Sequence, residues 1–75
     1  MNGSSEPVGV ILAVDAGRFA EVVEALRRAG LAVTGEQPII GTLEGTVAED
    51  RIPALAAVDG VASVDREYIN RIPPP

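Results

Sequence analysis

The chain has 75 residues, nearly half of them apolar, which predicts one small domain with a thin aliphatic core and marginal stability. Its formal net charge of −5 argues against a nucleic-acid partner, which needs a basic face, and no apolar stretch is long enough to cross a membrane. Cysteine, histidine and lysine are absent, so the usual metal ligands, general bases and amine nucleophiles are missing, and we predict no enzyme activity, no cofactor and no metal.

The first half of the chain reads as a polar lead, a strand and a helix. Residues 1–7 are polar and predicted to be flexible. The apolar run 8–14 is typical of a strand covered on at least one face. Apolar residues then recur at helical spacing over 18–29, which predicts a helix that Asp15 caps and Gly30 ends. The residues expected to face inward are Phe19, Val22, Val23 and Leu26.

The second half predicts a hairpin, a short helix and a last strand. A strand over 31–34 is expected to be interrupted at 35–38 by a bulge or loop, with 39–40 and 42–47 completing the hairpin and its turn near Gly41 or Gly35. Glu49 and Asp50 are expected to cap a helix over 51–58 that Gly60 ends. The residues of this helix expected to face inward are Ile52, Leu55 and Ala56. A strand over 61–67 follows.

The two halves of the chain share a pattern. In residues 28–33 and again in residues 58–64, the end of a helix is followed by a glycine and then by a strand that starts with an aliphatic residue and alanine. Strand–helix–strand repeated twice is the βαββαβ pattern of the ferredoxin-like α+β fold, with a four-stranded antiparallel sheet and both helices on one face. We expect this domain to span 8–69 and a proline-rich extended tail to occupy 70–75. The other sheet face is left open, which requires a partner, a second copy or a polar surface.

The segment 55–67, Leu-Ala-Ala-Val-Asp-Gly-Val-Ala-Ser-Val-Asp-Arg-Glu, resembles the closing segment of subtilisin propeptides and of the stand-alone proteinase inhibitors related to them. Strand, helix and hairpin also follow that family's order loosely over 8–72. The resemblance implies a protein-binding module that inhibits a subtilisin-like serine protease or acts as its folding chaperone. The open sheet face would lie over two helices of the protease, and the tail would enter the substrate cleft.

The same resemblance implies the site residues. Asp65 and Glu67 match the carboxylates that accept from N–H groups at the protease's helix N-termini, and they are two apart on one strand face. Two departures stand out: Arg66 interrupts the acidic cluster, and Pro73 follows the position expected to precede the scissile bond, which favours a persistent inhibitor. The tail residues that match the cleft-filling stretch are Tyr68, Ile69, Asn70, Arg71 and Ile72.

Other interpretations remain open. The turn from Asp15 to Arg18 could hold a small metabolite, as in ACT-like regulatory domains, or the open face could close against a second copy in a homo-oligomer. Asp65 and Glu67 could also serve only to protect an edge strand from aggregation. Glu44, Glu49 and Asp50 are weak candidates for an acid pair or metal site. We expect a cytoplasmic location if the chain is full-length, and leave it open if it was excised from a secreted precursor.

Overall fold

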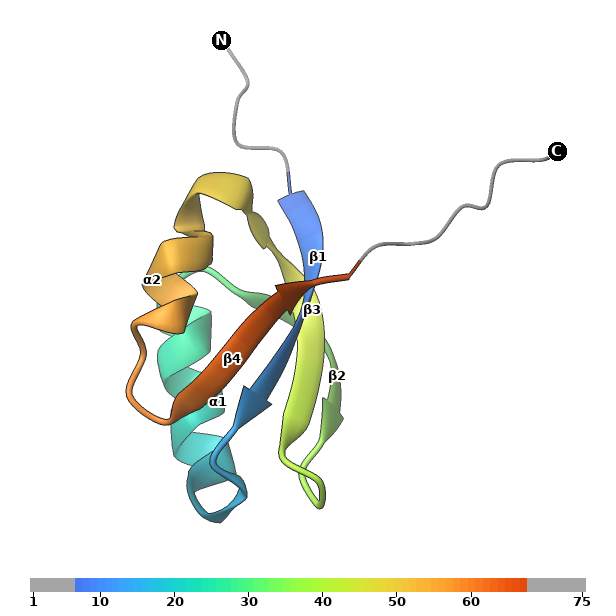
Figure 1. Ribbon diagram of the computed structural model, residues 1–75, viewed down its shortest axis with the longest axis vertical. Coiled ribbons are helices and arrows are strands. Elements are labelled where there is room, and N and C mark those ends of the chain that lie inside the picture. Colours follow the sequence, from blue (N-terminus) through green and yellow to red (C-terminus); the bar gives the residue numbers. More distant parts are fainter. Residues whose placement is uncertain (1–6, 68–75) are drawn as a thin grey trace, which may run out of the picture.

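The computed structural model describes residues 7–67, which form a four-stranded antiparallel sheet with two helices on one of its faces (Figure 1). The strand order is β2-β3-β1-β4, and every neighbouring pair is antiparallel, so the predicted ferredoxin-like fold is confirmed. The elements in chain order are β1 (Pro7–Val14), α1 (Phe19–Arg28), β2 (Ala32–Gln37), β3 (Thr42–Ala48), α2 (Ile52–Ala56) and β4 (Val61–Arg66). Short 3₁₀ turns, Ala16–Arg18 and Glu49–Arg51, precede the two helices.

The core lies between the sheet and the helices, and β1 shows how the sequence creates it. Val10, Leu12 and Val14 are buried toward the helices, whereas Ile11 points to the other face. All four α1 residues predicted to face inward are buried, and among residues 7–67 no polar or charged side chain is. The buried set is Val10, Leu12, Val14, Phe19, Val22, Val23, Leu26, Leu31, Leu43, Val47 and Leu55.

The two ends of the α1 segment follow the sequence prediction. The Asp15 side chain accepts a hydrogen bond from the Gly17 N–H at 2.9 Å and so caps the 3₁₀ turn that leads into the helix. Gly30 has a φ of +113°, a conformation that residues with a side chain rarely adopt, and the chain turns there into β2.

The second helix is shorter than predicted and differs in two details. Glu49 and Asp50 lie within the preceding 3₁₀ turn instead of capping the helix from outside it. Ile52 is half-buried and Leu55 is buried, but Ala56 is exposed, which corrects the prediction that it faces inward. A helix of little more than one turn directs only the i, i+3 pair toward the sheet.

The β2–β3 hairpin decides two alternatives that the sequence left open. Of a bulge or a loop at 35–38, the bulge is confirmed, because the register shifts between Val33 and Gly35 and residues 35–37 continue β2. Of Gly35 and Gly41, Gly41 is the turn glycine, with a φ of +74° in the turn at residues 38–41. Ile39 and Ile40, predicted to be part of the hairpin, form the exposed tip of this turn.

Both helices within residues 7–67 are too short to cross a membrane. The proposed domain limits, 8–69 with a lead over 1–7 and a tail over 70–75, stay a prediction, because most of the lead and all of the tail lie outside the described residues. Pro7 is the one residue of the lead that the structure describes, and it starts β1.

Candidate functional site

The sheet face away from the helices is the candidate site, and we call it the open face. The backbone register lines up its residues in three rows that cross the sheet in the order β4, β1, β3, β2. Among residues 7–67, Ile11 is the one large apolar side chain on this face, and it lies in the middle row. The rows are Glu67–Gly9–Thr46–Ala32, Asp65–Ile11–Glu44–Gly35 and Ser63–Ala13–Thr42–Gln37.

Asp65 and Glu67 both lie on the open face, as their spacing predicts. Asp65 pairs with Ile11 across the β1–β4 ladder. The Glu67 N–H donates to the Gly9 carbonyl oxygen at 2.9 Å, and its carboxylate lies beside Gly9, since a Cβ there would be 3.2 Å from Glu67 Oε1. Both side chains are exposed, so a partner that covers the face would meet two carboxylates at its β4 edge.

A third carboxylate, that of Glu44, lies on this face and was not predicted there. Glu44 stands opposite Ile11 on β3, in the same row as Asp65. Its side chain lies over Gly35 on β2, where a Cβ would be 2.9 Å from Glu44 Oε2. Successive side chains of a strand point to opposite faces of the sheet. Because Leu43 and Gly45 are buried on the helix side, Glu44 between them points to the open face.

Arg66 does not interrupt the acidic face, although it lies between the two acidic residues in the sequence. It pairs with Val10, whose side chain is buried on the helix side, so Arg66 projects to that side as well. There its guanidinium donates to Glu49 Oε2 at 2.7 Å. The open face therefore carries the negative charge of Asp65 and Glu67 without a cation between them.

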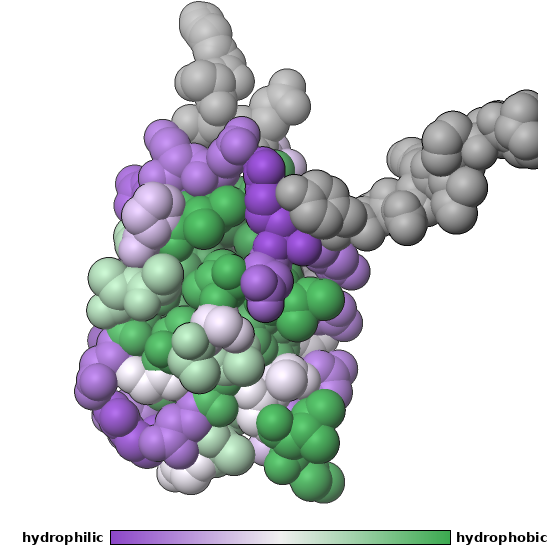
Figure 2. All heavy atoms as spheres, viewed as in Figure 1, coloured by the Kyte–Doolittle hydropathy of each residue, from purple (hydrophilic) through white to green (hydrophobic). Residues whose placement is uncertain are grey.

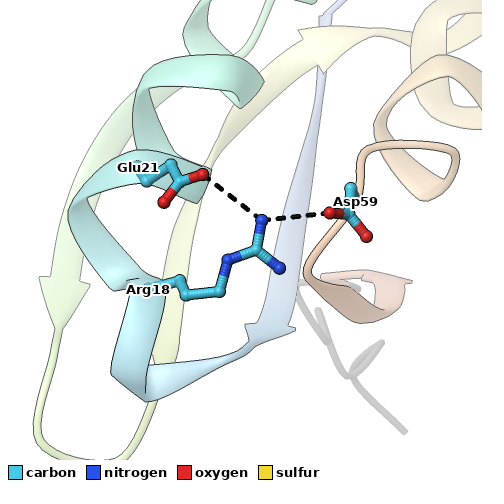
Figure 3. Close-up of polar contacts among 3 residues, drawn as sticks. All are labelled: Arg18, Glu21 and Asp59. Carbon is cyan, nitrogen blue, oxygen red and sulfur yellow. Dashed lines mark hydrogen bonds and ion pairs between the residues drawn. The ribbon is translucent and has the colours of Figure 1, made fainter.

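The start of β4 is tied to the beginning of α1. The Asp15 N–H donates to the Gly60 carbonyl oxygen at 2.9 Å. Arg18 donates to Asp59 at 3.0 Å and to Glu21 at 3.3 Å, so its guanidinium bridges the helix and the α2–β4 turn (Figure 3). The hydrogen bond that Arg18 donates to Asp59, followed by the one that it donates to Glu21, raises the pKa of Arg18. These contacts hold the strand that carries Asp65 and Glu67.

In the other candidate sites, polar side chains form hydrogen bonds or ion pairs with residues of the domain itself. In the Asp15–Arg18 turn, Asp15 is the cap and Arg18 forms the bridge just described, so the ACT-like interpretation stays a prediction without a free charged group to support it. Glu44 and Glu49 are separated, one on the open face and one paired with Arg66. Within residues 7–67, no three acidic, histidine or cysteine side chains gather as a metal site would require.

A groove of about 440 Å³ lies on the helix side, between α1 and the end of β2. Its apolar floor includes Phe19 and Val23, and the Arg27–Glu36 ion pair of 3.5 Å stands at its side. Because α1 and the open face are on opposite sides of the sheet, this groove is separate from the carboxylates of β4.

The fold and the open face define a small ferredoxin-like α+β domain that offers one acidic sheet surface to a partner. The sequence matches the family described as "Putative peptidase inhibitor domain" over residues 2–67, and the chain belongs to that family. Comparison with curated proteins and with solved structures gives no significant match. A peptidase is thus the class of partner, and inhibition the role, that the family indicates.

Of the residues that the sequence predicts to bind a protease, the structure describes two, Asp65 and Glu67. The five tail residues from Tyr68 to Ile72 lie outside residues 7–67, so their part in the site stays a prediction.

Proposed function

We propose that the chain inhibits a subtilisin-like serine protease, docking by its open face and its C-terminal tail. The observation that carries this proposal is the position of Asp65 and Glu67, side by side along β4 on an uncovered sheet face. The match to a peptidase inhibitor family over residues 2–67 supports the partner class.

The chemistry of docking follows from the residues on this face. Helix N-termini expose unpaired N–H groups and carry a partial positive charge, so a carboxylate placed there gains roughly 0.3–2 kcal/mol. On β1, the small residues Gly9 and Ala13 flank Ile11, so Ile11 is the apolar side chain that a partner covering this face would bury. Asp65 stands beside Ile11 in the middle row, and Glu67 stands beside Gly9 in the next row, so both carboxylates line the β4 edge of the face.

The tail supplies the inhibitory part of the proposal. β4 leads directly into residues 68–72, which would pair as an extended strand with the edge of the substrate cleft. Pro73 would occupy the position after the scissile bond, and proline there resists cleavage. This favours an inhibitor that persists over a propeptide that is cut and released, while a chaperone role in folding the same protease remains the alternative within this proposal.

Neutralising the two carboxylates tests the docking. We expect D65N/E67Q to raise the Ki for subtilisin by roughly 3- to 700-fold, since two helix-terminal contacts of roughly 0.3–2 kcal/mol each lose their charge. The Ki of the parent chain should also rise with ionic strength, and that of the variant should rise less. The measurement is residual subtilisin activity titrated with each chain at low and at high salt.

The matched control is E24Q/E36Q, which changes the net charge equally but at exposed positions beside the groove on the helix side, away from the open face and from the Arg18 bridge. It should leave the Ki unchanged. Equal weakening by both double variants would mean that only net charge matters, and the assignment of Asp65 and Glu67 to docking would then be wrong.

A further inference from the structure

The tip of the β2–β3 hairpin exposes two large aliphatic side chains. Ile39 is 94% exposed and Ile40 is 71% exposed. No charged residue lies between Glu36 and Glu44, so the tip is also uncharged. Figure 2 shows it as an apolar cluster that projects at the lower right, where the hairpin ends in Figure 1. Exposed turns are usually formed by Gly, Pro, Asn, Asp and Ser, because an apolar side chain in water costs free energy that burial would recover.

The fold holds this tip in place. The Gly41 N–H donates to the carbonyl oxygens of Gln37 at 3.0 Å and Pro38 at 3.2 Å, which closes the turn. The Gly41 carbonyl oxygen accepts from the Val14 N–H at 2.8 Å, which ties the turn to the end of β1. At the base of the hairpin the Thr42 hydroxyl bonds the Gln37 side chain at 3.2 Å. These hydrogen bonds already hold the turn that carries the two isoleucines. Burying them against a partner would therefore cost little additional conformational entropy of the chain.

The position of the tip relates it to the open face. Among residues 7–67, the exposed large apolar side chains are Ile11, Ile39 and Ile40, so they lie either on the open face or at its end. Gly41 bonds β1 at Val14, whereas Glu67 bonds β1 at Gly9. Five residues of strand separate these points, roughly 17 Å. A partner that buries a usual patch of roughly 800 Å², about 30 Å across, can reach both.

We infer that Ile39 and Ile40 form an apolar anchor that contacts the protease outside its substrate cleft, at the end of the sheet opposite to the one from which the tail leaves. This inference rests on the proposed function and adds a second contact to it. The occupant is the protease surface and not a second copy, because the tip adjoins the face that carries Asp65 and Glu67. A partner docked on that face meets the tip without any change in the fold.

The test replaces both isoleucines in the full chain. We expect I39S/I40S to raise the Ki for subtilisin by roughly 10-fold or more. The rise should come from faster dissociation with an unchanged association rate and no dependence on salt, because uncharged side chains do not steer the encounter. The midpoint of thermal unfolding should stay the same, since neither side chain is buried. The matched control is A56S/A57S, which changes two exposed residues, the last of α2 and the one after it. This variant should inhibit like the parent.

The outcomes separate the two ideas. If the parent chain inhibits subtilisin and I39S/I40S inhibits equally well, the anchor is wrong and the proposed function stands. If the parent chain does not inhibit, the proposed function fails for this protease and the anchor fails with it. If sedimentation shows that the parent chain dimerises, that I39S/I40S is monomeric and that the Ki is unchanged, the tip is a contact between copies, which also overturns the anchor.

Discussion

A chain that ends at Glu67 is expected to keep its fold and to lose inhibition of subtilisin. The fold should survive because, among residues 7–67, every buried residue lies between Val10 and Leu55, and the last ladder contact there is the bond from the Glu67 N–H to the Gly9 carbonyl oxygen. Inhibition should be lost because the open face can hold the protease without blocking its cleft, and the tail is the part proposed to enter it. Residual subtilisin activity and circular dichroism, measured on the same preparation, check both halves.

A chain that ends at Ile72 is the matched control for this truncation. It keeps the residues proposed to fill the cleft and removes only Pro73–Pro75. We expect it to inhibit subtilisin, because the cleft-filling residues remain. The protection of the bond after Ile72 is tested by Pro73→Ala in the full chain, which should be cut there and lose inhibition with time. Full inhibition by the chain that ends at Glu67 would contradict the role of the tail and would leave the open face as the whole inhibitory surface.

The substitution Gly60→Ala is expected to destabilise the domain severely. Gly60 has a φ of +98°, and an added Cβ would be 2.5 Å from Val22 Cγ2, a buried atom of α1. Alanine in such a conformation costs about 1–3 kcal/mol, and forcing a methyl group into packed side chains costs about 1–3 kcal/mol more. The sum, roughly 2–6 kcal/mol, is a large part of the stability that a domain of this size has, about 0.05–0.15 kcal/mol per residue.

Urea unfolding followed by circular dichroism measures this effect as a change in the unfolding free energy. Gly17→Ala is the matched control, because the added Cβ would meet only Asp15 Oδ1 at 3.4 Å and the backbone φ is not in the positive range. It should change stability little. An unfolding free energy for Gly60→Ala within the error of the parent would show that α1 and the α2–β4 turn can separate to accept a methyl group, and the tight junction described above would be wrong.

The stability of this junction and the function of the face are connected. Gly60 immediately precedes β4, the strand that leads to Asp65 and Glu67. Its carbonyl oxygen accepts from the Asp15 N–H, and Arg18 bonds the neighbouring Asp59. Loosening this corner would shift β4 relative to β1 and so move both carboxylates. For this reason the Ki of a Gly60 variant depends both on the positions of the two carboxylates and on the stability of the domain. The unfolding measurement reports the stability alone.

The elements whose signal is local are the ones that the sequence predicts well. The inward face of α1, the cap at Asp15 and the chain reversal at Gly30 could be predicted because helical spacing, capping and positive φ depend on neighbours in the chain. The shared face of Asp65 and Glu67 follows from the same kind of rule, since side chains two apart on a strand point the same way. The order of these elements was enough for the ferredoxin-like fold.

The pairing of the strands depends on the tertiary fold, and the features that rest on pairing were left open or missed. The sequence allowed a hairpin turn near Gly35 or Gly41, and pairing put the bulge at Gly35 and the turn at residues 38–41, with Ile39 and Ile40 at its exposed tip. Pairing also put Glu44 in the same row as Asp65, with Ile11 between them, and turned Arg66 toward Glu49. Register is a long-range property, because a slip of one residue exchanges the two faces of a strand, and no window of sequence contains both partners of the ladder.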